Sequence, residues 1–160
     1  MSAKGNEAKS APADRVLEIT RVFAAPRHLV FEAWTDPAHL KHWSAPKGFT
    51  IPVCEGDLRV GGRWRCCMVS PEGVEHWLGG VYREIERDRK IVQTHVWDSE
   101  GGHETLLTVT FEDVEGGTKM TMHQAEFQTR ASRDDHREGW NECFDKLETL
   151  LTDAHAGSSR

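Results

Sequence analysis

The sequence lacks the features of a nucleic-acid-binding or membrane protein. Its 160 residues carry 20 Lys and Arg against 26 Asp and Glu, a formal net charge of -6, so the overall positive charge that attracts proteins to phosphate backbones is missing. No uninterrupted apolar run is long enough to cross a bilayer or to form the apolar part of a signal peptide. These absences predict a cytoplasmic protein with no membrane span and no nucleic-acid partner.

Cysteine is scarce and its spacing is not that of a metal or redox motif. Of the four cysteines, no pair has the C-x-x-C spacing common in zinc and redox sites. Cys66 and Cys67 are adjacent, and neighbouring side chains on a strand point to opposite faces, which disfavours a bond between them. Free thiols in a reducing cytosol are therefore predicted.

Catalytic and metal-binding motifs are also missing. The chain has no G-x-S-x-G turn, no P-loop and no G-x-G-x-x-G sequence after a predicted strand. Nine histidines are present, but His39 and His42, three residues apart, have no identifiable third ligand. Nor do Glu75 and His76 form a recognisable acid-base dyad with Glu104 or another group. We therefore predict no metal, no cofactor and no catalytic residues.

What the chain does contain is a series of strands closed by a helix. We predict a disordered leader over residues 1–14, a single domain over residues 15–152 and a flexible tail over residues 153–160. A first strand near residues 16–23 precedes two short helices, over 27–34 and ending near 43. Further strands are predicted at 49–53, 63–70, 75–85, 90–97, 104–112 and 118–127, and a helix at 132–151. The short connectors between strands favour an antiparallel meander.

The last three strands predict one apolar face. Folding the final hairpin about Gly116-Gly117 places Phe111 opposite Met120 and Val109 opposite Met122. Folding the preceding hairpin about residues 99–102 places Leu107 opposite Val96 and Val109 opposite Thr94. Because one apolar face needs a cover, we expect the last helix, with Trp140, Phe144, Leu147 and Leu151, to lie on it.

Several short sequences together resemble one family. They include Arg21-Val22-Phe23-Ala24-Ala25-Pro26, Phe31-Glu32-Ala33-Trp34-Thr35-Asp36-Pro37, Asp57-Leu58-Arg59-Val60-Gly61-Gly62-Arg63-Trp64 and Gly139-Trp140. Because of these residues, the chain resembles the AHSA1-like (activator of Hsp90 ATPase homologue) family of the START-like, or SRPBCC, superfamily. The resemblance covers about residues 15–152. The resemblance implies an α+β helix-grip fold, in which a curved antiparallel sheet of six to seven strands wraps around a long C-terminal helix and two short helices follow the first strand.

The same resemblance implies a function. In this superfamily the space between sheet and helix often forms a cavity for an apolar small molecule. The family also includes a domain of an Hsp90 cochaperone, but that protein carries a further N-terminal domain where this chain has a 14-residue leader. An Hsp90 partner is therefore not expected.

We thus predict a noncatalytic protein that binds an apolar or amphipathic ligand between sheet and helix. The predicted ligand-binding residues are Trp43, Trp64, Cys66, Met68, Thr94, Val96, Leu107, Val109, Met120, Met122, Trp140 and Phe144. The same residues could instead fill a large core. Two other functions stay open: a homodimeric or chaperone-associated interaction protein that uses an outward-facing Trp97, and a cyclase- or hydrolase-type enzyme.

Overall fold

The structure, a computed structural model, describes residues 13–158. Most of the predicted leader (1–12) and the last two residues of the predicted tail lie outside this range. The elements are η1 (Ala13–Arg15), β1 (Leu17–Phe23), α2 (Arg27–Thr35), α3 (Pro37–Trp43), β2 (Thr50–Gly56), β3 (Arg63–Val69), β4 (Glu75–Glu86), β5 (Lys90–Trp97), η2 (Asp98–Glu100), β6 (Glu104–Val114), β7 (Gly117–Ala125) and α4 (Arg130–Ser158).

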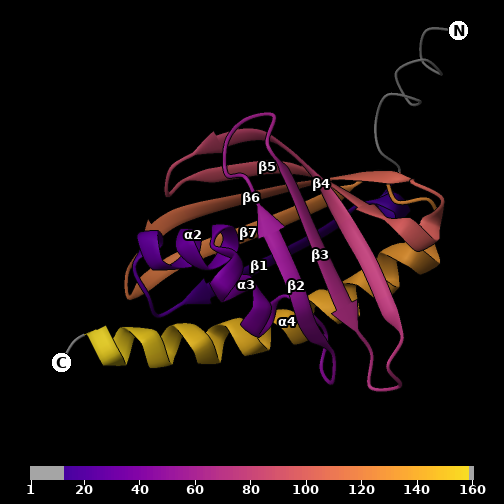
Figure 1. Cartoon of the computed structure of the whole chain (residues 1–160). Helices are drawn as coiled ribbons and strands as arrows, with labels where there is room; N and C mark the ends of the chain where they lie inside the picture. Colours follow the sequence, from indigo (N-terminus) through magenta and orange to yellow (C-terminus); the bar gives the residue numbers. More distant parts are fainter. Residues whose placement is uncertain (1–12, 159–160) are drawn as a thin grey trace, which may run out of the picture.

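The strands form one curved antiparallel sheet in the order β1-β7-β6-β5-β4-β3-β2. Each strand from β2 to β7 pairs with the next in the chain, and β1 returns to pair with β7. In Figure 1 the sheet curves around α4, while α2 and α3 lie in front, between the two ends of the sheet. This arrangement confirms the predicted α+β helix-grip fold with its two short helices and long final helix.

Helix α4 is longer than the sequence pattern indicated. We expected it to begin at Ser132, but it begins at Arg130, and the Thr129 side chain accepts a hydrogen bond from the Ser132 backbone N–H at 3.0 Å. The helix then continues to Ser158, so residues 153–158, which we predicted to be a flexible tail, are helical. Among the described residues no helix is both long and apolar enough to span a membrane.

Of the two predicted hairpin registers, one is confirmed and the other is wrong. In β6–β7, Phe111 pairs with Met120 and Val109 with Met122, as predicted. In β5–β6, Val109 pairs with Ile91 instead of Thr94, a shift of three residues. The connection is asymmetric, because η2 takes up part of it and Gly101 and Gly102 follow with φ of 66° and 80°. An odd shift turns every side chain of β5 to the other face.

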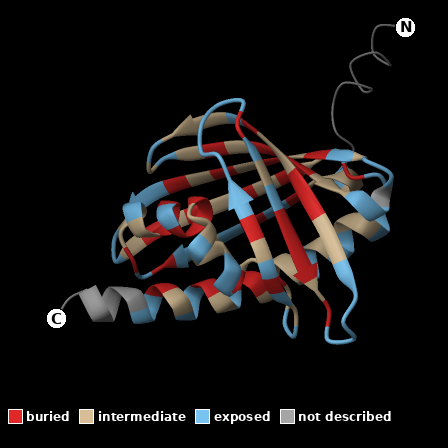
Figure 2. Ribbon diagram, in the orientation of Figure 1, coloured by how far each residue is buried: buried red, intermediate tan, exposed pale blue. Residues whose placement is uncertain are grey.

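Buried residues recur along the strands and along α2 and α4 (Figure 2). One group, which we call the closed core, packs beneath β1, β6 and β7 against α2 and the C-terminal half of α4. Its members include Leu17, Phe23, Val30, Trp43, Val109, Phe111, Met120, Met122, Phe144, Leu147 and Leu151. A smaller group, including Ile51, Cys54, Cys66, Met68 and Leu78, lies under β2, β3 and β4.

Candidate functional site

A cavity of about 480 Å³ lies between β2–β5 and the N-terminal half of α4, with α3 at its side. Its wall is mostly apolar and rich in aromatic rings. The main apolar lining residues are Trp34, Leu40, Trp64, Met68, Leu78, Trp97, Leu107 and Trp140. Pockets for small organic ligands commonly measure about 300–1,000 Å³ and have walls of this kind.

The cavity reaches solvent at a mouth lined by exposed residues. These are Glu55 and Gly56 at the end of β2, Ser99 after β5, and Asp135 on the second turn of α4. The two charged residues of the lining are thus both acidic, and no lysine or arginine of the described residues lines the cavity. The site therefore offers no cation to pair with an anionic ligand.

Three polar side chains lie deep in this apolar wall: Tyr82 from β4, and Gln93 and His95 from β5. Burial, together with a smaller effect of the nearby His136, lowers the pKa of His95 to about 3. Burial likewise raises the pKa of Tyr82 to about 12, with smaller contributions from Cys66 and Cys54. At neutral pH both side chains are therefore uncharged, and both can form hydrogen bonds as neutral groups.

His95 stands in a cage of aromatic rings. Its ring centroid lies 5.4 Å from that of Trp64, 5.8 Å from Trp97 and 6.1 Å from Trp140. Among the described residues, its Nδ1 is the one buried side-chain nitrogen or oxygen that lacks a hydrogen-bond partner. An unpaired buried polar atom costs free energy, and such atoms in native structures are often found at functional sites.

A chain of hydrogen bonds ties α4 to the sheet beside the cavity. Trp140 Nε1 donates to Gln124 Oε1 at 2.8 Å, and Gln124 Nε2 donates to Thr105 Oγ1 at 2.8 Å. Thr105 Oγ1 in turn donates to the His95 carbonyl oxygen at 3.1 Å. Through these three bonds the indole of Trp140 is fixed in orientation by β7, β6 and β5.

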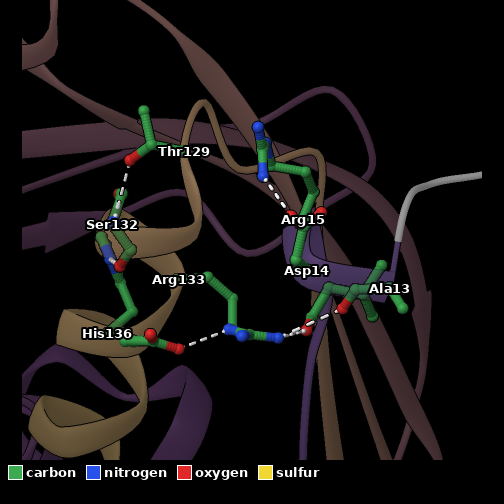
Figure 3. A network of polar contacts seen from close by, with 9 residues as sticks. Ala13, Asp14, Arg15, Thr129, Ser132, Arg133 and His136 are labelled. Atoms are coloured by element: carbon green, nitrogen blue, oxygen red, sulfur yellow. Dashed lines mark hydrogen bonds and ion pairs between the residues drawn. The ribbon is translucent and has the colours of Figure 1, made fainter.

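The first turns of α4 are held by a second set of contacts (Figure 3). Trp97 Nε1 donates to His136 Nε2 at 3.0 Å, so His136 Nδ1 carries the proton that it donates to the Ser132 carbonyl oxygen at 2.8 Å. Arg133 donates to the carbonyl oxygens of Ala13 and Val16 at 3.1 and 3.3 Å. This end of α4 is thereby attached both to β5 and to the segment that leads into β1.

The structure divides the twelve predicted ligand-binding residues into three sets. Five line the cavity: Trp64, Cys66, Met68, Leu107 and Trp140. Five others are buried in the closed core and do not line the cavity: Trp43, Val109, Met120, Met122 and Phe144. The last two, Thr94 and Val96, belong to the face of β5 opposite His95.

The predicted inward placement of Thr94 and Val96 is wrong because the β5 register is shifted. On that face the Thr94 Oγ1 accepts a hydrogen bond from the Val81 N–H of β4 at 2.8 Å. The neighbouring Gly80 approaches the Thr94 carbonyl so closely that a Cβ would overlap it. Trp97 is also placed differently from our expectation: it faces the cavity and α4 instead of an outer surface.

The polar part of the site was missed from the sequence. The predicted register placed Thr94 and Val96 on the apolar face of β5, which turned the alternating Gln93 and His95 away from it, and Tyr82 was not among the predicted ligand-binding residues. Alternation along the strand places Ile91, Gln93, His95 and Trp97 on one face of β5. Two polar residues among the four on that face are typical of a face exposed to solvent. His136, on α4, had no motif that distinguished it.

One other cluster could hold a cation by spacing alone. Ligand atoms of Glu32, Asp36 and His39, at the junction of α2 and α3, lie within 4.8 Å of one another. Asp36 Oδ1 already accepts the Ala38 N–H at 2.9 Å, which caps α3. Glu32 lies 3.9 Å from His39, so these side chains have structural roles without an ion.

Comparisons with known proteins give the same fold. A protein from Chromobacterium violaceum is 27% identical, with a TM-score of 0.81 over 86% of this chain and 96% of its own. A protein from Nitrosomonas europaea is also 27% identical, with a TM-score of 0.79 over 91% of this chain and 99% of its own. The AHSA1 protein from Silicibacter pomeroyi is 25% identical, with a TM-score of 0.78 over 88% and 99%.

The sequence comparison identifies the family. A search of curated proteins found no match. The sequence pattern of the family described as Activator of Hsp90 ATPase homolog 1-like protein matches residues 24–152, which include every residue that lines the cavity and all of the closed core except the residues of β1. The chain therefore belongs to the Activator of Hsp90 ATPase homolog 1-like family.

Proposed function

We propose that the protein binds an uncharged, amphipathic small molecule in the cavity beneath α4. The observation that carries this proposal is the composition of the wall: a space of about 480 Å³ with aromatic and aliphatic sides into which Tyr82, Gln93 and His95 bring neutral polar groups. Burial of the apolar part of a ligand would supply most of the affinity, at about 25 cal/mol per Å². The polar groups would orient the ligand.

The charge of the lining supports a neutral ligand over an anionic one. A carboxylate in this cavity would lose its hydration and find no lysine or arginine, while Glu55 and Asp135 at the mouth would repel it. His95 would not supply the missing positive charge, because its lowered pKa keeps it neutral at physiological pH. A hydroxyl or carbonyl group can instead exchange hydrogen bonds with neutral side chains.

Titration with two matched probes tests this proposal. We expect a medium-chain fatty alcohol to bind at least about tenfold more tightly than the fatty acid of equal length, a difference of about 1.4 kcal/mol. Isothermal titration calorimetry, or native mass spectrometry, measures both. Equal binding of the two probes would contradict a neutral site, and absence of any binding would contradict the cavity as a ligand site.

Two substitutions of the same kind localise the binding. Met68→Trp places an indole in the cavity wall and should abolish binding of the alcohol. Val22→Trp puts the same side chain on the exposed surface of β1 and should leave binding unchanged. Unaltered binding by the Met68→Trp variant would show that the probe sits elsewhere.

The enzyme alternative has one observation in its favour, the ionisable His95 inside the cavity. General bases work best when their pKa is near the working pH. A group with a pKa of about 3 is a weak base at neutral pH, so His95 serves better as a neutral hydrogen-bonding group than as a proton acceptor in catalysis. Binding is therefore the function that this geometry supports best.

A further inference from the structure

Two cysteines of the cavity wall face each other across neighbouring strands. Cys54 in β2 pairs directly with Cys66 in β3, and both side chains are buried and line the cavity. Their Sγ atoms are 2.6 Å apart. Directly opposed residues of antiparallel strands have Cα atoms about 4.5–5.5 Å apart, which falls within the separation of about 4.4–6.8 Å that disulfides span.

We propose that Cys54 and Cys66 form a reversible disulfide, which makes the β2–β3 wall of the cavity a site of thiol oxidation. The register gives the pair its specificity. Cys67 is opposite Val53 and points to the other face of β3, so it cannot take the place of Cys66 without a shift of the strand. This inference does not depend on a ligand and goes beyond the proposed binding function.

The surroundings assign different roles to the two sulfur atoms. A hydrogen bond from Cys66 lowers the pKa of the Cys54 thiol, and the positive charge of Lys41 acts in the same direction. The same contact with Cys54, together with burial, raises the pKa of Cys66. Because the thiolate is the reactive form, Cys54 is the first sulfur to be oxidised and Cys66 is the resolving thiol.

A small neutral oxidant such as hydrogen peroxide fits both the cavity and the chemistry. The Cys54 thiolate attacks one peroxide oxygen, the O–O bond breaks, and the departing hydroxide takes a proton to become water, leaving a sulfenic acid. The Cys66 sulfur then attacks the Cys54 sulfur, the S–O bond breaks, and the hydroxide leaves as water with the proton of Cys66. The two sulfur atoms lose two electrons in all, and one peroxide is reduced to two water molecules.

The wild-type protein provides the direct test. After equimolar hydrogen peroxide, the number of free thiols should fall from four to two and return to four with dithiothreitol. Trypsin cleaves after Lys47, Arg59, Arg65 and Arg83, so peptides 48–59 and 66–83 should be joined in the oxidised sample and separate in the reduced one. Retention of four thiols, or a link that includes Cys143, would overturn the proposal.

Two matched variants, one in each peptide, test the assignment of the linked cysteines. Cys67→Ser should keep the linked peptides and lose one thiol from the starting count. Cys54→Ser should show no link under the same peroxide treatment. A link that persists in Cys54→Ser, or disappears in Cys67→Ser, would contradict the assignment of Cys54 and Cys66.

Discussion

The two ends of the space between sheet and α4 are built from the same kinds of element but packed differently. Beneath β1, β6 and β7, the closed core fills the space with side chains such as Met120, Met122 and Phe144, each with no exposed surface. Beneath β2–β5 the facing residues include His95 and Gln93, and a cavity of about 480 Å³ remains. One helix thus contributes to the core with its C-terminal half and to the cavity with its N-terminal half.

This difference follows from the residues that each end places inward. Aliphatic and thioether side chains adapt to one another and close up, as Met120 does where its Sδ accepts the Trp34 Nε1–H at 3.1 Å. Around the cavity the indole rings are tied to polar partners, because Trp140 is held by Gln124 and Trp97 is bonded to His136. The cavity is therefore maintained by the polar contacts around it.

The largest expected effect is a difference in stability between two Met→Ala variants, one in the closed core and one in the cavity wall. Met120→Ala should lower the free energy of unfolding by about 3–5 kcal/mol, because it opens a void in the closed core and removes the partner of Trp34. Met68→Ala in the cavity wall should cost only about 1–2 kcal/mol, because this side chain already borders empty space. Equilibrium unfolding in urea measures both, and equal losses would show that the cavity is closed in solution.

The second effect is a pH dependence that originates in the cavity. The pKa of His95 is about 3 in the folded protein and about 6.5 in the unfolded chain, so below pH 6.5 the unfolded state binds a proton that the folded state does not. Its contribution to stability is full above pH 6.5 and is lost as the pH falls toward 3. Between pH 7 and pH 5 this should lower the free energy of unfolding by about 2 kcal/mol.

The His95→Phe variant isolates this contribution. Carboxylates elsewhere titrate equally in both proteins, so the difference between the two pH profiles reports His95. The variant should also be no less stable than the wild type at pH 7, because it removes the unpaired Nδ1. Identical slopes between pH 7 and pH 5 would mean that the imidazole is hydrated or paired in solution.

The smallest expected effect concerns Gly139, which lies on α4 at the cavity. A Cβ at this position would meet the Pro46 Cγ at 3.6 Å, an ordinary contact, so the fold does not require glycine here. Gly139→Ala should therefore stabilise the protein by up to about 1 kcal/mol through helix propensity. Gly80→Ala is the contrasting variant, because its Cβ would overlap the Thr94 backbone, and it should destabilise. Thermal unfolding followed by circular dichroism compares the two.

The closed core was much easier to predict than the cavity. The β6–β7 register followed from Gly116-Gly117, a short and symmetric turn, and it correctly aligned Phe111 with Met120. The β5–β6 connection contains a 3₁₀ turn that folding about the middle of the loop cannot reveal, and the resulting error turned His95 outward and Thr94 inward. The first register was predicted correctly because its turn is symmetric, and the second was predicted wrongly because its connection is not.

Cavity volume was also beyond the reach of the sequence. The apolar periodicity that places Trp140 and Phe144 on one side of α4 is the same for a filled core and for an open pocket. What distinguishes the two is how each indole is held, which depends on contacts such as that of Trp140 with Gln124, sixteen residues away in the chain. Such contacts become visible only when the strands are assembled.

The hydrogen bonds from Trp140 through Gln124 and Thr105 to the His95 carbonyl also bear on kinetics. They cross three strands, and the Arg133 contacts anchor the first turn of the helix. Displacing α4 would break the Trp140–Gln124 bond, the Trp97–His136 bond and the Arg133 contacts together, so opening by that route would have a high activation barrier. Under the proposed function, a ligand therefore exchanges through the mouth between Glu55 and Asp135, and its association rate depends on the width of that opening.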